Sequence, residues 1–358
     1  MLNILITGDN MMDPDKFKES IEEAFGKDMF NIRIKRYSFE QNGFYIDENT
    51  LIPSGMCFED PKVKMSYPEC GVNEFYGEPY SLMDDIVDVD ILIIHGAALP
   101  RRVIENANRL KHIISLRGGP ANIDMESVKE RGIHFYNTNG KNAQAVAEFA
   151  LGALLDFERG ISFGSERLTD DWWWIKGVDS FESHELQYKK FGFVGYGRIA
   201  QALRKLLLGF EIEALTYSPH VDDSILERDG VKRASLEELV STCDYVTLHT
   251  RPVNGAPPIM DAEKIGMMKK SAVLINTGRG GLLDYEALKT ALEEKRIRGA
   301  VLDVLGGAPF GFYEEIIALD NTLVTPHIAG QSVETCERAC RMGVALLRKI
   351  VEEEHISA

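Results

Sequence analysis

The chain has 358 residues, a length that corresponds to about two domains of ordinary size. Hydrophobic residues make up 44% and charged residues 27%, which is the balance of a globular protein and not of a disordered one. A formal charge of −16 repels phosphate backbones and anionic lipids, so we expect no nucleic-acid partner and no polybasic membrane anchor.

Neither the apolar runs nor the cysteines indicate a membrane or secreted protein. The longest apolar runs, such as Ile91–Ile94, are far shorter than the roughly 20 residues of a membrane-spanning helix. Met1–Gly8 lacks the charged start of a signal peptide and alternates like a first strand. The five cysteines are an odd, dispersed set; Cys336 and Cys340 share one face of an expected helix, where two buried thiols are favoured over a zinc site. We therefore predict a cytoplasmic protein without a metal site.

Short β-branched runs alternate with helical patterns along the chain, which predicts βαβ units and a parallel sheet with helices on both faces. The predicted strands, in chain order, are Leu2–Thr7, Asp90–His95, Ile113–Leu116, Ile133–Tyr136, Gly192–Gly195, Glu213–Tyr217, Tyr245–His249, Ala272–Asn276 and Ala300–Val304. The predicted helices are Asp15–Phe25, Pro100–Arg109, Asn139–Arg159, Arg198–Leu208, a short helix that opens with the capping box Ser235–Glu238, and one from Asp284 to Glu294.

Two segments interrupt this alternation. The Ala-rich helical pattern over Asn139–Arg159 separates an irregular first part from a regular βαβ block, and we interpret it as the crossing between two domains. Residues 40–78 are rich in Gly, Pro, Tyr and acidic residues and have no clear period. They form either a loop over an active cleft or, as we favour, an irregular surface wrap.

The segment Gly195-Tyr-Gly197-Arg-Ile-Ala200 fits the pattern G-x-G-x-x-G/A, directly after a predicted strand and at the start of a predicted helix. Gly195 permits the tight turn, Gly197 lets the backbone approach a pyrophosphate, and Ala200 allows close packing of helix on strand. Arg198 and Ile199 open the helix, whose N-terminus has free N–H groups for the phosphates. The segment therefore predicts a dinucleotide site.

The choice between the two nicotinamide dinucleotides depends on the end of the next strand. An acidic residue that binds the adenosine ribose is expected about 20 positions after the glycine loop, where this chain has Ser218. No Lys or Arg follows immediately, and Asp222 and Asp223 oppose further phosphate charge. The sequence weakly favours NAD(H) over NADP(H) and leaves the choice open.

An ordered series of motifs over about residues 90–345 resembles the D-isomer-specific 2-hydroxyacid dehydrogenase family. The motifs are Arg117–Asp124, Ala145–Phe149, the glycine loop, Cys243–His249, Ile275–Gly281, Leu302–Val304 and Thr325–Gly330. The resemblance implies two Rossmann/flavodoxin-like, doubly wound parallel-sheet domains with a cleft between them, in a homodimer. Residues 1–141 with 326–358 would form the substrate-binding domain, and residues 142–325 the dinucleotide-binding domain.

The implied activity is hydride transfer between a nicotinamide dinucleotide and a small D-2-hydroxy acid or 2-keto acid. Arg279 can bind the substrate carboxylate bidentately, and His327 titrates near neutral pH and can give or take the proton. A surface salt bridge for Arg279 and a core position for His327 are the weaker alternatives. By resemblance, Gly118 and Gly119 offer backbone N–H groups to the same carboxylate. The other residues implied at the cofactor are Asp303, for the nicotinamide amide, and Thr277, Gly278 and Gly330.

One catalytic residue of the family pattern is missing. The family has a glutamate shortly after Leu-Asp-Val, and in this chain Ala308, 19 residues before His327, occupies its position. That carboxylate would orient the imidazole and raise its pKa. Glu314 or Glu315 in the following segment is a candidate replacement.

Two further features bear on the substrate. Phosphoglycerate-specific members carry a cation after the strand that here ends in His95, and this chain has His95–Ala98 there, with Arg101 and Arg102 close by. The 31 residues that follow His327 are too few for the regulatory domain that we would expect in a phosphoglycerate-specific member. Both features favour a smaller or neutral-tailed keto acid. The triplet Trp172–Trp174 is interpreted as packing between domains or in a dimer rather than as a substrate contact.

Two functions compete. The first is an active dehydrogenase or keto-acid reductase, favoured because Arg279 and His327 are both present. The second is a dinucleotide-sensing binding protein on the same fold, which the alanine at position 308 suggests. A Rossmann-type methyltransferase explains neither Asn276–Gly281 nor Thr325–Gly330.

Overall fold

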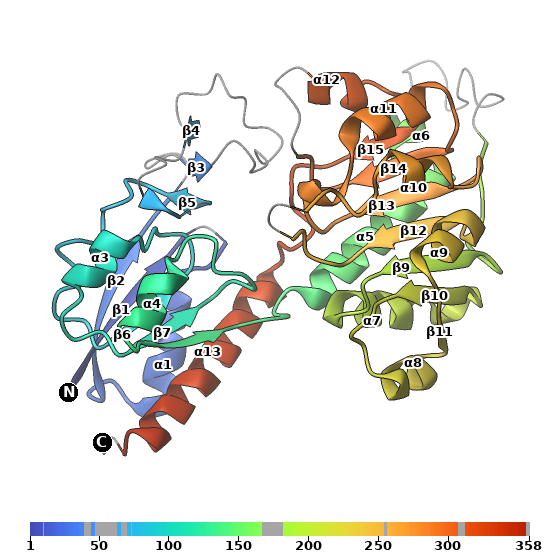
Figure 1. Cartoon of the computed structure of the whole chain (residues 1–358). Coiled ribbons are helices and arrows are strands. Elements are labelled where there is room, and N and C mark those ends of the chain that lie inside the picture. Colours follow the sequence, from blue (N-terminus) through green and yellow to red (C-terminus); the bar gives the residue numbers. More distant parts are fainter. Residues whose placement is uncertain are drawn as a thin grey trace. The chain divides into compact units, whose positions relative to one another are not determined.

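The computed structural model describes residues 1–9, 11–38, 44–46, 63–65, 70–72, 74–166, 182–253, 256–306 and 312–355, with backbone only at 44–46, 63–65 and 312–314. It divides into two compact units (Figure 1). The first unit contains the chain up to Lys141 and the C-terminal segment from Gln331, and the second contains Asn142–Gly330. The interpretation of Trp172–Trp174 lies outside the described residues.

The first unit is built on a five-stranded parallel sheet of order β2-β1-β6-β7-β8. Alternate residues of β1 enter different cores: Leu5 packs with residues of α3 and α4, whereas Ile4 and Ile6 pack with residues of α1 and α13. This period of two is what a strand buried on both faces requires. The strands are β1 Leu2–Gly8, β2 Phe30–Arg36, β6 Ile91–Ile94, β7 His112–Ser115 and β8 His134–Asn137.

Four helices cover this sheet, namely α1 Pro14–Phe25, α3 Arg101–Asn106, α4 Met125–Glu130 and α13 Val333–Glu353. Helix α13 lies against α1, and a Cβ at Gly343 would overlap the ring of Phe17, so glycine is what allows this close packing (Figure 1). Cys336 and Cys340 lie on the buried face of α13 as free thiols, as predicted. Ser332 begins the helix, since its Oγ accepts a hydrogen bond from Thr335 N.

The second unit has a seven-stranded parallel sheet of order β11-β10-β9-β12-β13-β14-β15. Its strands are β9 Lys190–Val194, β10 Glu213–Tyr217, β11 Val231–Arg233, β12 Tyr245–Leu248, β13 Val273–Asn276, β14 Gly299–Leu302 and β15 Thr322–Val324. Phe191 and Phe193 of β9 pack with Ala147, Ala150 and Leu154 of the helix α5 in one core. Two doubly wound parallel sheets confirm the predicted fold class.

Helix α5 spans Ala143–Arg159, so the predicted start at Asn139 is wrong by four residues. Gly140 has φ 86°, in the left-handed region, and Lys141 N donates to Thr138 O in a turn. Glycine adopts this φ readily and thereby ends the helical pattern early. At the other end of α5, both guanidinium Nη groups of Arg298 pair with the fully buried Glu158.

The other helices of the second unit are short, and the longest of them are α7, which follows the glycine loop, and α11. Their bounds are α6 Ile161–Glu166, α7 Arg198–Leu206 with a 3-10 turn Leu207–Phe210, α8 Asp223–Asp229, α9 Leu236–Thr242, α10 Ala262–Gly266, a 3-10 turn Gly280–Leu282, α11 Tyr285–Glu293 and α12 Phe312–Ile317. Ser235 caps α9 by accepting from Glu238 N, as the capping-box pattern predicts.

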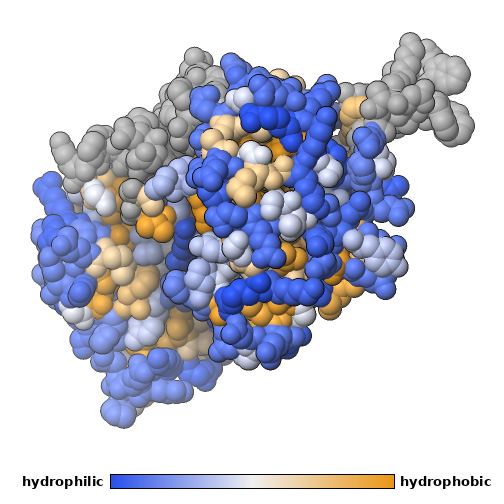
Figure 2. Space-filling view, turned by 45° about the vertical axis from the view of Figure 1, so that its right-hand side comes forward, coloured by the Kyte–Doolittle hydropathy of each residue, from blue (hydrophilic) through white to orange (hydrophobic). Residues whose placement is uncertain are grey.

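Within residues 40–78 the structure places a small sheet of order β4-β3-β5, with β3 Phe44–Ile46, β4 Val63–Met65 and β5 Phe75–Tyr76. No helix among the described residues is long and apolar enough to span a bilayer. Hydrophilic side chains cover most of the face shown in Figure 2, with hydrophobic ones in smaller areas between them.

Candidate functional site

The predicted dinucleotide loop lies between β9 and α7, at the carboxyl edge of the second sheet. Gly195 has φ 91°, and a Cβ there would come within 2.9 Å of the backbone of His249 and Thr250, so both conformation and space require glycine. Its N–H donates to Tyr217 O at 2.8 Å. Because β9 and β12 are the strands at which the sheet order reverses, the loop lies at the switch point where open α/β sheets bind ligands.

The start of α7 fits a phosphate group. Gly197 is the N-cap and provides no side chain to cap the helix, and a Cβ on it would meet no atom within 4 Å. The N–H groups of the first turn, at Arg198 and Ile199, therefore meet no capping side chain from Gly197 and have the positive end of the helix dipole behind them. Ala200 is fully buried against the core, as its position in the pattern predicts.

A cation that the sequence analysis missed reaches the end of β10. Arg233, the last residue of β11, donates one guanidinium N–H to Ser218 O and another to Val221 O. Its charge is paired with Asp223 at 2.5 Å. The sequence alone did not show this contact, because only the pairing of β10 with β11 brings Arg233 opposite Thr216, two residues before Ser218.

The segment after β13 is a turn organised by one buried amide. Asn276 Oδ1 accepts from Gly278 N, and Asn276 Nδ2 donates to Arg279 O, both at 3.0 Å. The Thr277 hydroxyl is buried and has no hydrogen-bond partner among the described residues. An orphaned buried hydroxyl beside a shaped turn fits a ligand group that would satisfy it. Thr277 and Gly278 therefore suit a place at a cofactor.

Arg279 is exposed, and its guanidinium forms one hydrogen bond, from Nη1 to Gly278 O at 2.8 Å. Within the part of the chain that the structure describes, it makes no ion pair with a carboxylate. The alternative of a surface salt bridge is therefore not supported by the described residues. A guanidinium held on a rigid turn and open to solvent is suited to a carboxylate ligand.

Asp303, one residue after β14, fastens the loop that carries His327. Its Oδ1 accepts from Thr325 Oγ1 at 2.8 Å and from Ile328 N at 2.9 Å, and its Oδ2 accepts from Ala329 N at 2.9 Å. Asp303 is 1% exposed, so these charge-assisted bonds are sheltered from water. The family resemblance implies a place for Asp303 at the cofactor, and its contact with the loop of His327 was not predicted.

His327 has φ 53°, in the left-handed region that non-glycine residues rarely adopt. It is partly exposed, so it is not a core histidine. The contacts of Asp303 on both sides of it, at Thr325 and at Ile328, hold the loop in this costly conformation. Such retained strain is typical of functional positions.

Arg279 and His327 follow strands of one sheet in matching positions. Asn276 of β13, Leu302 of β14 and Val324 of β15 are neighbours in register across the sheet. Arg279 lies three positions after Asn276, and His327 lies three positions after Val324. Neighbouring strands are about 4.8 Å apart, so the two strand ends are separated by about 10 Å. The sheet thus brings both to its carboxyl edge.

The remaining predicted residues are less constrained. Gly330 is close to Asn142, because a Cβ on it would come within 2.8 Å of Asn142 Nδ2. Gly118 and Gly119 lie in the loop after β7 in the first unit, where a Cβ on Gly119 would meet no atom within 4 Å. A backbone with such open space can be approached by a ligand.

Of the two candidate replacements for the family glutamate, the side chain of Glu314 lies outside the described residues, as does Ala308, which occupies the position of the glutamate. The carboxylate of Glu315 pairs with Lys289 of α11. This ion pair engages the Glu315 carboxylate with α11.

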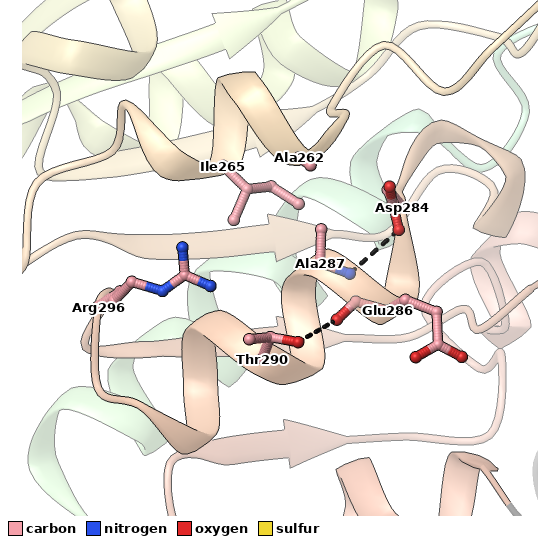
Figure 3. A pocket seen from close by; sticks show the side chains of 7 residues that line it. All are labelled: Ala262, Ile265, Asp284, Glu286, Ala287, Thr290 and Arg296. Carbon is pink, nitrogen blue, oxygen red and sulfur yellow. Dashed lines mark hydrogen bonds between the residues drawn. The ribbon is translucent and has the colours of Figure 1, made fainter.

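A surface hollow of the second unit lies away from these residues and includes none of them. It has a volume of about 330 Å³, lies between α10 and α11 and is lined by Asp284, Thr290 and Arg296 among others (Figure 3). Asp284 caps α11 through Ala287 N, and Thr290 Oγ1 donates to Glu286 O, so its polar groups already serve the helix. Among the described residues no group of three His, Cys, Asp or Glu side chains is placed to hold a metal.

Comparisons with known proteins agree with this geometry. A family model described as "D-isomer specific 2-hydroxyacid dehydrogenase, NAD binding domain" matches residues 151–329. Hydroxypyruvate reductase of Thermotoga maritima is 32% identical over 82% of this chain and 94% of its own length. D-3-phosphoglycerate dehydrogenase of Methanocaldococcus jannaschii is 34% identical over 76% of this chain, which spans 52% of that protein. The crystal structure of TT0316 protein from Thermus thermophilus superposes with a TM-score of 0.73 at 26% identity, covering 98% of this chain and 97% of that one.

Proposed function

Since the chain belongs to the family of D-isomer-specific 2-hydroxyacid dehydrogenases, we propose which of its residues perform the hydride transfer that defines this family. The protein is an oxidoreductase that acts on 2-hydroxy acids or 2-keto acids with a nicotinamide dinucleotide. Arg279 binds the substrate carboxylate and polarises the adjacent carbonyl, and His327 exchanges the proton with the carbonyl oxygen. One observation carries this proposal: a turn and a loop that the fold holds rigidly present both side chains at one sheet edge.

The dinucleotide supplies or accepts the hydride at C2 of the substrate when it is bound. The residues that would hold it are the turn and first helical residues at the phosphates and the strand ends beyond them: Gly195, Gly197, Arg198, Ile199, Ser218, Thr277, Gly278, Asp303 and Gly330. Gly118 and Gly119 donate backbone N–H groups to the substrate carboxylate. The first unit then binds substrate and the second binds dinucleotide.

His327 acts as an acid in keto-acid reduction and as a base in hydroxy-acid oxidation. Asp303 supports this role through the loop rather than through the ring, since its carboxylate bonds to Thr325 Oγ1 and to the N–H groups of Ile328 and Ala329. Ala308 occupies the position of the family glutamate, so that carboxylate is not the group that orients the imidazole in this chain.

NAD(H) is the proposed preference. Binding of NADP(H) requires a cation for the 2′-phosphate, and the described cation at the end of β10, Arg233, is paired with Asp223. Asp223 would also repel the phosphate directly. Location in the cytoplasm and assembly as a homodimer remain proposals, the first from the odd, dispersed cysteines and the second from the family resemblance.

Steady-state assays with NADH and NADPH against glyoxylate, hydroxypyruvate, pyruvate and longer keto acids test this function. We expect turnover with at least one acid, a loss of about 100-fold in kcat for His327→Asn, and little change in the Kd of NADH. The alternative, a dinucleotide-sensing binding protein, is favoured by Ala308 in the place of the glutamate. Tight NADH binding without turnover of any acid would select that alternative.

A further inference from the structure

Another surface hollow of the second unit is lined by cations and lies at the ends of two neighbouring helices. It has a volume of about 350 Å³, and it is lined by Arg204, Lys205, Leu208, Arg228 and Asp229. Arg204 and Lys205 belong to the last turn of α7, and Arg228 belongs to the last turn of α8 (Figure 1). In a chain with a formal charge of −16, three cations around one hollow need an explanation.

The side chain of Arg204 reaches from α7 to the end of α8. Its Nη2 lies 3.5 Å from the place of a Cβ on Gly230, the residue that caps α8. Its Nε is buried without a hydrogen-bond partner, and its guanidinium forms no ion pair within the described part of the chain. A buried donor without an acceptor costs free energy, so native structures rarely keep one unless a ligand or water satisfies it. Arg204 therefore has donors for an anion in the hollow.

The hollow has more positive charge than its own carboxylate can balance. The buried side chain of Asp229 accepts from Arg228 Nε at 2.8 Å, from Arg228 Nη2 at 3.0 Å and from Tyr196 Oη at 3.1 Å. This ion pair is neutral, whereas Arg204 and Lys205 make no ion pair among the described residues. The carboxyl ends of α7 and α8 supply about half a negative charge each, which is about one negative charge for two cations. A positive excess therefore remains even when the helix ends are counted.

The hollow lies away from the place proposed for the dinucleotide phosphates. Both helices begin at the carboxyl edge of the sheet, since α7 follows β9 and α8 follows β10. Their last turns are therefore directed toward the opposite edge. Arg204 lies six residues after Arg198, about 9 Å further along α7 at the rise of an α-helix. An anion in the hollow is thus a second ligand and not a part of the dinucleotide.

We propose that this hollow binds the phosphate group of a small phosphate monoester. Such a group carries about two negative charges near neutral pH and has three strong acceptor oxygens, whereas a carboxylate has one charge and two oxygens. Arg204 and Lys205 donate to the phosphate, together with Nη1 of Arg228, which has no acceptor among the described residues. Leu208 is 58% exposed and contacts the organic part of the ligand. The proposal does not depend on the proposed function, because the hollow includes none of the residues assigned to hydride transfer.

Titration calorimetry of the full chain with glycerol 3-phosphate tests the site. Arg204→Gln should raise the Kd about tenfold or more, because it removes charge-assisted hydrogen bonds of a partly buried group. Lys205→Gln changes an exposed side chain, so it should fold normally and raise the Kd about threefold to fivefold. If Arg204→Gln does not fold, Lys205→Gln decides.

Two controls make the result specific. Arg296→Gln, in the hollow between α10 and α11, should leave the Kd unchanged, since Arg296 pairs with Glu294. Acetate should bind about tenfold more weakly than glycerol 3-phosphate, because it has half the charge. Absence of binding by the wild type, an unchanged Kd in the Arg204 and Lys205 variants, or equally tight binding of acetate would overturn the proposal.

Nuclear magnetic resonance locates the bound anion. In the full chain labelled with ¹⁵N, glycerol 3-phosphate should shift the side-chain Nε–H signal of Arg204 and leave the backbone amides of Arg198 and Ile199 unchanged. The Arg204 signal is assigned by its absence from the spectrum of Arg204→Gln. A response confined to the amides of Arg198 and Ile199 would place the anion at the glycine loop and refute the site in the hollow.

Discussion

Replacing Asp303 with asparagine tests whether its carboxylate holds His327, the proposed catalytic histidine, in place. The carboxylate accepts three hydrogen bonds, from Thr325 Oγ1, Ile328 N and Ala329 N. An asparagine keeps one acceptor oxygen and places an NH₂ group where the other was. At least one backbone N–H of the loop then faces a donor, and the other bonds lose their charge.

The size of the effect follows from these contacts. A hydrogen bond to a charged group contributes about 1.5–3 kcal/mol and one to a neutral group about 1 kcal/mol. Losing one bond and neutralising the others therefore costs about 3 kcal/mol or more in local stability. Each 1.4 kcal/mol is a factor of ten, so opening of the loop should become roughly 100-fold more frequent.

Hydrogen exchange at the amides of Ile328 and Ala329 measures this opening directly. In Asp303→Asn we expect both amides to exchange roughly 100-fold faster and kcat to fall about tenfold, because His327 leaves its strained conformation more often. Thr325→Val removes a single contact and should give a smaller change of the same kind. If Asp303→Asn raises the Kd of NADH and leaves both exchange rates unchanged, the reasoning is refuted and Asp303 serves the cofactor alone.

Three further predictions concern other charged groups. Arg279→Lys keeps the charge and loses the bidentate geometry, so kcat/KM for the keto acid should fall about 100-fold with the Kd of NADH unchanged. Asp223→Asn frees Arg233 and should improve kcat/KM with NADPH relative to NADH about tenfold in steady-state assays, whereas Glu227→Gln should not. Burial lowers the pKa of His249 to about 4. Below pH 6.5 the unfolded chain therefore binds more protons at His249 than the folded chain does, so the free energy of unfolding falls as the pH falls. At pH 5 this loss is about 2 kcal/mol. Denaturant unfolding at pH 7 and pH 5 should show that His249→Asn removes this loss; an equal loss in the variant would contradict it.

The sequence predicted the central strands well because they are buried on both faces. The β10 strand was predicted with both ends correct, and β13 within one residue, since runs of apolar and β-branched residues with polar ends have few other structures available. The strand β2 was missed, because Phe30–Arg36 alternates with charged residues and lies at the edge of its sheet. An edge strand needs less apolar sequence, and so it gives a weaker signal.

The backbone of the glycine loop and of the turn that carries Arg279 could be predicted for a different reason. It depends on contiguous residues, in which the glycines and Asn276 set the conformation of their own turn. The contacts of Arg233 and Asp303 with segments 15 or more residues away were not predicted, because only the sheet order brings those segments close. Motifs of contiguous residues predict the backbone conformation of their own segment. The order of the strands determines which charged residues from distant segments lie close together.

The two switch points differ in a way that follows from this distinction. In the second unit the position after β9 is Gly195, whose backbone leaves room for a ligand and whose helix supplies N–H donors. In the first unit the strand order reverses between β1 and β6. The position after β1 is Asp9, and the turn Asp9–Met12 closes on itself because the carboxylate of Asp9 accepts from Met11 N and Met12 N. The helix that follows, α1, is capped by Asp13, whose side chain accepts from Asp15 N. Carboxylates of the chain itself therefore occupy backbone N–H groups at this edge, whereas the glycine loop of the second unit supplies no such side chain.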